Sequence, residues 1–220
     1  MFLLAALAVA APASAATNWA KTVAATPEGG IRIGNPAAKV KIIEFASYTC
    51  SHCKVFNETG VPALKAKYIA SGAVSIEQRS FVRNGPDMAA SLLMACLAPV
   101  PALSFADALF AEQAQWTQPF TSLSEADSKS VADAPVAQQP ARLAAVSGLD
   151  RWAVTKGVPL AKGQACLASS KAQDRLLATR SEALTRYKLE GTPTFVINGA
   201  MQAEVYDWAS LEPRVQAALK

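Results

Sequence analysis

The pattern of hydrophobic and polar positions predicts a strand-helix-strand unit in the first third of the chain. A short alternation at 31–33 predicts an edge strand, and the apolar run at 39–46 predicts a buried strand. A helix follows from Cys50, with an interruption near Gly60. A second strand is expected at about 73–82.

The pattern then changes from strands to helices. Apolar residues recur every three or four positions in much of 86–170, which predicts a helical insertion, although the polar stretch 121–140 is expected to be mostly surface loop. A further helix at about 171–189 leads to a hairpin with an Asn-Gly turn at 198–199, and a last helix starts at about 207. This order of elements predicts an α/β fold.

Length and charge limit the possible classes of protein. With 220 residues, 51% of them hydrophobic, the chain is long enough for one sizeable domain, expected at 16–220. The 21 basic and 17 acidic residues give a net charge of only +4 and are scattered, so no nucleic acid partner is expected.

The N-terminus has the pattern of an export signal. Residues 1–11 are uncharged and apolar, and Pro12-Ala13-Ser14-Ala15 ends in the small-x-small pattern of a signal-peptidase site, so 1–15 is predicted to be a signal peptide cleaved after Ala15. The apolar run is too short to span a membrane, and no stable membrane insertion is expected. An exported chain would work in the periplasm, where disulfides persist.

The sequence Cys50-Ser51-His52-Cys53 follows directly on the buried strand. Such a pair of cysteines is typical of half a metal site or of a redox pair. A tetrahedral zinc site needs four Cys or His ligands, but His52 is the only histidine, and Cys96 and Cys166 stand apart from each other. The redox interpretation is therefore favoured, with no metal and no cofactor expected.

A redox role for Cys50 has a physical basis in its position at the first turn of a helix. The free N–H groups and the helix dipole favour a thiolate there and lower its pKa. His52 could add a hydrogen bond or a positive charge, or it could be a partly exposed loop residue without electronic effect. A stabilised thiolate stabilises the reduced form, which makes the disulfide a stronger oxidant.

Glu44 places a carboxylate in the middle of the buried strand. Burial of a charge is costly unless the group has a partner or a task. One alternative is that Glu44 points to solvent at a sheet edge. The other is that it lies beneath the helix, where it could exchange a proton with Cys53.

Together these features resemble the DsbA-like disulfide oxidoreductases of the thioredoxin superfamily. The resemblance rests on Cys50-Ser51-His52-Cys53, on Glu44 six residues upstream, on the late Gly191-Thr192-Pro193-Thr194-Phe195, and on the helical block between the two halves. It implies a thioredoxin-like fold, with a central mixed sheet flanked by helices and an inserted helical subdomain at about 86–170. It also implies an enzyme that introduces disulfide bonds into exported proteins.

The resemblance assigns roles to individual residues. Pro193 is expected to be cis and to face the cysteine pair, and Thr192 to present its backbone to a substrate peptide that adds as a short strand. Cys50 would be the exposed nucleophile and Cys53 the resolving thiol. The partners implied are reduced exported polypeptides and a membrane redox partner that reoxidises the protein.

Cys96 and Cys166 are expected to form a structural disulfide, because related proteins often carry a second bond in the helical block and free thiols are uncommon in an oxidising compartment. The alternative is two inert buried cysteines.

Two positions leave the direction of electron flow open. The best-known members have proline where this chain has Ser51, and Thr192 occurs in oxidases as well as in isomerases and reductases. A disulfide reductase or isomerase that uses the same site is therefore the alternative function. A binding or chaperone module without turnover is a third, which the intact cysteine pair with Glu44 and His52 argues against.

Overall fold

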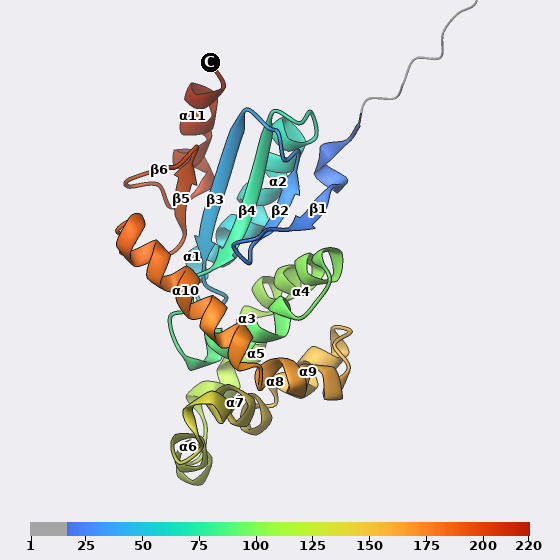
Figure 1. Cartoon of the computed structure of the whole chain (residues 1–220), viewed down its shortest axis with the longest axis vertical. Helices are drawn as coiled ribbons and strands as arrows, with labels where there is room; N and C mark the ends of the chain where they lie inside the picture. The colour runs from blue at the N-terminus through green and yellow to red at the C-terminus, as the bar shows by residue number, and fades with distance from the viewer. Residues whose placement is uncertain (1–16) are drawn as a thin grey trace, which may run out of the picture.

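The computed structural model describes residues 17–220, so the predicted signal peptide and its cleavage point lie outside the described residues. One mixed sheet forms the centre of the fold (Figure 1). Its strands are β1 (Val23–Ala25), β2 (Ile31–Gly34), β3 (Val40–Ala46), β4 (Val74–Ser80), β5 (Thr194–Ile197) and β6 (Ala200–Met201). They lie in the order β1-β2-β4-β3-β5-β6, with β3 and β4 parallel and all other neighbours antiparallel.

Strand β2 lies inside the sheet, so its prediction as an edge strand is wrong. Its outer side pairs with β1, in a register that sets Val23 opposite Ile33. The three residues of β1 are too few to show an alternating pattern, which is why this strand was not predicted from the sequence.

The helix after Cys50 continues past the predicted interruption near Gly60. It winds as α1 (Ser51–Val55), a π-helical segment at Phe56–Gly60, α2 (Val61–Leu64) and a second π-helical segment at Lys65–Ile69. Gly60 does not end the helix. It leaves room for the ring of Phe56, with which any side chain at this position would collide. Chain reversal comes only at Gly72, where φ is +85°.

Helices fill the stretch between β4 and β5. They are α3 (Gly85–Ala95), α4 (Pro99–Ala111), α5 (Gln113–Thr117), α6 (Glu125–Ala132), α7 (Gln139–Ser147), α8 (Leu149–Thr155), α9 (Leu160–Leu167) and α10 (Ser170–Arg186), and α11 (Trp208–Leu219) ends the fold. Helix α10 runs from the helical block back toward the sheet (Figure 1). No helix within residues 17–220 combines the length and apolar character needed to cross a membrane.

Helix α6 lies in the stretch that the sequence predicts to be mostly loop. It buries no residue, so it lacks the apolar periodicity that reveals other helices. Ser124 caps its first turn by accepting a hydrogen bond from the Asp127 N–H, and Lys129 pairs with Asp133 one turn later. Local polar contacts stabilise this helix instead of core packing.

The two faces of β3 contact different helices because its side chains alternate in direction. On one face, Ile42 packs with Phe56 and with Leu211 of α11. On the other, Phe45 packs with Ala183 of α10 and with Tyr187, which directly follows that helix. A separate apolar cluster fills the helical block and reaches Cys50 and Cys53.

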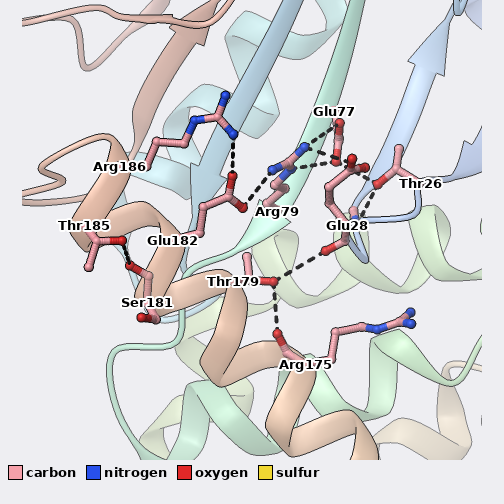
Figure 2. A network of polar contacts seen from close by, with 11 residues as sticks. Thr26, Glu28, Glu77, Arg79, Arg175, Thr179, Ser181, Glu182, Thr185 and Arg186 are labelled. Atoms are coloured by element: carbon pink, nitrogen blue, oxygen red, sulfur yellow. Dashed lines mark hydrogen bonds and ion pairs between the residues drawn. The ribbon is translucent and has the colours of Figure 1, made fainter.

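The α10 face of the sheet also carries a network of charged residues (Figure 2). Arg79, which is 5% exposed, donates from Nε to Glu77 at 2.7 Å and from Nη1 to Glu182 of α10 at 3.3 Å. Glu28 lies 3.8 Å from the same guanidinium. Arg186 extends the network by donating to Glu182 at 3.1 Å. The network connects β4, α10 and the β1–β2 turn.

Candidate redox site

Cys50 and Cys53 lie where β3 passes into α1. Cys50 is the N-cap residue of that helix and Cys53 lies in its first turn, and both are free thiols. Cys50 is only 4% exposed, so the prediction that it is an exposed residue is wrong. The segment at Thr192 packs against its sulfur. Its route to solvent is a hollow whose lining includes Ser51, His52 and Thr192.

The surroundings of Cys50 favour its thiolate and lower its pKa from 9.0 to about 4. The largest cause is a hydrogen bond from the Cys53 thiol, and burial opposes it. The Thr192 side chain and the backbone N–H groups of Cys53 and His52 add further stabilisation. The Thr192 carbonyl lies 3.1 Å from Cys50 Sγ, and as an acceptor it can hold only the protonated thiol.

The pKa of Cys53 is shifted in the opposite direction to that of Cys50. It is fully buried, and burial is the largest cause of a pKa well above its ordinary value. The hydrogen bond to Cys50 and the negative charge of Glu44 raise this pKa further. The two sulfurs are therefore different, with Cys50 ionised and Cys53 neutral near pH 7.

Glu44 is 1% exposed, and its strand β3 lies between β4 and β5. The alternative that Glu44 points to solvent at a sheet edge is therefore wrong. Gln78 Nε2 donates to one carboxylate oxygen at 3.4 Å, and the other oxygen has no partner. Burial raises the pKa of Glu44 to about 8, with a smaller contribution from Cys50. Near pH 7 Glu44 is therefore mostly a protonated acid beneath the cysteines.

His52 is exposed at the beginning of α1. Its backbone N–H is among the groups that lower the pKa of Cys50. An effect of its imidazole remains a prediction. Within residues 17–220, no three His, Cys, Asp or Glu side chains gather in a way that could hold a metal ion.

Thr192 and Pro193 are joined by a cis peptide bond beside the cysteine pair. Besides its carbonyl contact with Cys50, Thr192 has a hydroxyl that accepts a hydrogen bond from Arg83 Nη1 at 3.4 Å. The sequence motif thus indicated a segment that lies 142 positions further along the chain and that the fold brings into contact with Cys50.

Three residues at the site were missed by the sequence reasoning. They are Arg83, Asp87 and Gln113, all close to or within the helical block. For Asp87 a signal existed, because Asn84 caps α3 and an acidic residue at the third helical position is typical of a capping pattern. For Gln113 the sequence contains no comparable signal.

Cys96 and Cys166 are joined by a disulfide, the pairing that the resemblance implies. It connects the C-terminal end of α3 to α9. The alternative of two inert thiols is therefore wrong. The bond leaves Cys50 and Cys53 as the free cysteines of the described chain.

Comparison with known proteins gives matches to thioredoxin-like proteins and to proteins named disulfide oxidoreductases. The family model described as Thioredoxin matches residues 26–217. A protein of Rickettsia bellii, provisionally named a protein-disulfide oxidoreductase, is 26% identical over 88% of this chain and 66% of its own length. A similarly named Rickettsia felis protein is 27% identical over 86% of this chain and 59% of its own length, so this chain spans only part of these relatives.

Solved structures show the same fold. The protein-disulfide isomerase of Novosphingobium aromaticivorans is 33% identical, with a TM-score of 0.81 over 87% of this chain and 98% of its own. The α-DsbA1 of Wolbachia pipientis superposes with a TM-score of 0.67 at 20% identity, over 89% of this chain and 93% of its own. The family match over most of the chain, on a sheet with an inserted helical block, shows that this chain belongs to the thioredoxin family, with DsbA-like proteins as structural neighbours.

Proposed function

We propose that this protein is a thiol-disulfide oxidoreductase that introduces disulfide bonds into exported polypeptides through Cys50 and Cys53. The observation that carries the proposal is the opposite shift of the two thiol pKa values, down for Cys50 and up for Cys53. A dithiol with one strongly stabilised thiolate has a stabilised reduced form, so its disulfide is an oxidant. The family match and the similarly named relatives support this chemistry.

The first step begins from the Cys50–Cys53 disulfide. A substrate thiolate attacks Cys50 Sγ, a mixed disulfide forms, and Cys53 leaves with the electron pair of the broken bond. Since Cys53 is buried and its thiolate is unfavourable, it requires a proton at once. Glu44, protonated near pH 7 and buried beneath the cysteines, is the proposed donor.

The second step releases the product. A second substrate thiolate attacks the substrate sulfur of the mixed disulfide, and Cys50 leaves as a thiolate, which its low pKa makes a good leaving group. The substrate loses two electrons and gains a disulfide. The protein ends as the free dithiol seen in this structure.

The proposed setting is the periplasm, with reduced exported polypeptides as substrates and a membrane redox partner that restores the Cys50–Cys53 disulfide. The pattern at 1–15 supports export. The Cys96–Cys166 disulfide also supports an oxidising compartment. Thr192, beside Cys50 and preceding a cis proline, is the proposed contact for the substrate backbone.

A disulfide isomerase or reductase is the second candidate, and one observation favours it. The Novosphingobium aromaticivorans protein, which is 33% identical to this chain, is named a protein-disulfide isomerase. The same site chemistry would then operate with the dithiol as the resting form.

The reduction potential of the Cys50–Cys53 pair distinguishes these candidates. Equilibration with glutathione buffers, followed by thiol trapping, is expected to give a potential well above the value of about −270 mV typical of thioredoxin. The absorbance of the Cys50 thiolate is expected to titrate near pH 4. A thioredoxin-like potential together with a Cys50 pKa near neutral would overturn the oxidase proposal.

Variants of the two cysteines test the assignment of roles. Cys50→Ala is expected to abolish oxidation of a reduced model protein, because the attacked sulfur is lost. In oxidised glutathione, the Cys50 thiolate of Cys53→Ala is expected to displace one glutathione thiolate and to remain in the mixed disulfide, visible by mass spectrometry, since the resolving thiol is absent. Full activity in Cys50→Ala would show that another group is the nucleophile.

A further inference from the structure

The segment that leads into the redox pair is held by side chains of the helical block. Gln113, the first residue of α5, donates from Nε2 to the carbonyl of Tyr48 at 2.8 Å and to the carbonyl of Cys50 at 3.0 Å. The Cys50 carbonyl also accepts the first helical hydrogen bond, from the Lys54 N–H. One side chain thus holds two carbonyls of the approach to α1.

Asp87 of α3 holds the same segment by accepting a hydrogen bond from a backbone N–H group in it. Its carboxylate is completely buried and accepts from the Tyr48 N–H at 2.8 Å and from the Arg83 N–H at 3.0 Å. Arg83 in turn reaches the hydroxyl of Thr192 at 3.4 Å. Asp87 therefore connects the approach to Cys50 with the loop that contacts the cis-proline segment.

These contacts determine how the Cys50 sulfur meets its neighbours. Cys50 is the N-cap residue with extended backbone angles, φ −95° and ψ 122°, and the backbone N–H groups of His52 and Cys53 are among the groups that lower the pKa of its thiol. Hydrogen-bond geometry is sensitive to displacements of a few tenths of an ångström. If the approach segment moved, the sulfur would lose part of the stabilisation of its thiolate.

We propose that Gln113 and Asp87 are positioning residues of the redox pair, through which the helical block sets the thiolate stability of Cys50. The inference rests on the proposed function, which it deepens. Neither side chain touches the reacting sulfurs, and both act through the backbone of Tyr48–Cys50.

The chain offers a matched control for Gln113. Gln173 of α10 also donates from Nε2 to two backbone carbonyls, those of Ala137 at 2.8 Å and of Leu167 at 3.4 Å. Both carbonyls belong to the helical block and lie away from the cysteine pair. Gln113→Ala and Gln173→Ala therefore remove the same kind of contact, one at the redox site and one remote from it.

The test compares the thiolate titration of Cys50 and the equilibrium with glutathione in the two folded variants. Gln113→Ala is expected to raise the pKa of Cys50 by about one unit, with a matching shift of about tenfold in the glutathione equilibrium toward the oxidised protein. Gln173→Ala is expected to leave both quantities at the wild-type values while losing a similar amount of stability.

Asp87 is tested with a graded pair of variants, since its complete loss could prevent folding. Asp87→Asn keeps one acceptor oxygen and is expected to raise the pKa of Cys50 by less than Asp87→Ala does. If Asp87→Ala does not fold, the decision rests on Asp87→Asn and Gln113→Ala.

Two results would overturn the inference, and they differ from failure of the proposed function. An unchanged Cys50 pKa in both Gln113→Ala and Asp87→Asn would show that the contacts are structural only. An equal shift in Gln173→Ala would show a general effect of destabilisation. A wild-type protein whose Cys50 pKa is ordinary and whose pair does not oxidise thiols would instead refute the proposed function itself.

Discussion

Two clusters of polar side chains occupy opposite faces of the same pair of strands. On one face, Glu44 of β3 lies opposite Gln78 of β4, beneath the redox cysteines. On the other face, Glu77 pairs with Arg79, whose guanidinium contacts Glu182 of α10, as Figure 2 shows. The alternation of side chains along a strand separates the two clusters by a single residue.

The clusters differ in how completely their buried groups are paired. Arg79 donates to two carboxylates with a third nearby, and Glu77 also accepts a hydrogen bond from Thr26. Glu44 has one long hydrogen bond and an oxygen without a partner. Breaking a paired buried cluster is strongly destabilising, whereas an unpaired buried acid is kept neutral and can donate a proton.

The largest expected effect is on the paired face. Arg79→Ala is expected to cost about 3–5 kcal/mol of unfolding free energy, because it removes a buried cation and leaves the partly buried carboxylates of Glu77 and Glu182 without their partner. Arg186→Ala, at the exposed end of the same network, is the control and is expected to cost at most about 1 kcal/mol. Denaturant unfolding measures both. The comparison fails if Arg79→Ala, once folded, shifts the pKa of Cys50.

The next effect concerns the disulfide of the helical block. Replacing both Cys96 and Cys166 by Ser is expected to lower the unfolding free energy by about 2–4 kcal/mol, because the bond closes a long loop. Stability is measured by denaturant unfolding and the Cys50 thiolate by its absorbance. We expect no change in the thiolate pKa. A shift would mean that this bond, too, positions the redox site.

Glu44→Gln tests the unpaired face by its pH dependence. The folded pKa of about 8 lies above the ordinary 4.5, so the folded state binds this proton more tightly than the unfolded chain does. The stability contributed by Glu44 is therefore complete below pH 4.5 and is lost as the pH rises to about 8, at up to about 1.4 kcal/mol per pH unit.

The Gln side chain stays neutral, so Glu44→Gln is expected to make the reduced protein more stable than wild type near pH 8 while slowing disulfide exchange. Unfolding curves of both proteins between pH 5 and 9 isolate this contribution, since all other titrating groups are shared. An unchanged difference between the two proteins across this range would place an ordinary, ionised carboxylate at Glu44.

The smallest expected effect is that of His52→Ala. Removing the imidazole takes away a polar group that could stabilise the thiolate, so the pKa of Cys50 is expected to rise modestly. It should stay far below 9.0, because the Cys53 thiol and the backbone N–H groups remain. Thiolate absorbance against pH measures the shift. An unchanged pKa would support the alternative of an exposed residue without electronic effect.

The sequence predicted those parts of the site whose signal is local. Cys50 and Cys53 belong to one helical turn, Glu44 interrupts an apolar run, and a short motif marks Thr192 and Pro193. In contrast, Asp87 and Gln113 act on Tyr48 from 39 and 65 positions away, and no local pattern reports such contacts. Strand β1 and helix α6 escaped prediction because one is very short and the other buries no apolar side chain.

By itself, the sequence determined the order of the main strands and helices, apart from β1 and α6, the alternation that gives each strand two faces, and the presence of a cysteine pair at a helix N-terminus. Only the tertiary structure decided that β2 lies inside the sheet, that Glu44 is buried without a full set of partners, and that the thiols of Cys50 and Cys53 have opposite pKa shifts. The physical reason is that periodicity and helix ends are encoded by neighbouring residues. Burial and hydrogen bonding at an ionisable group depend instead on segments that only folding brings together.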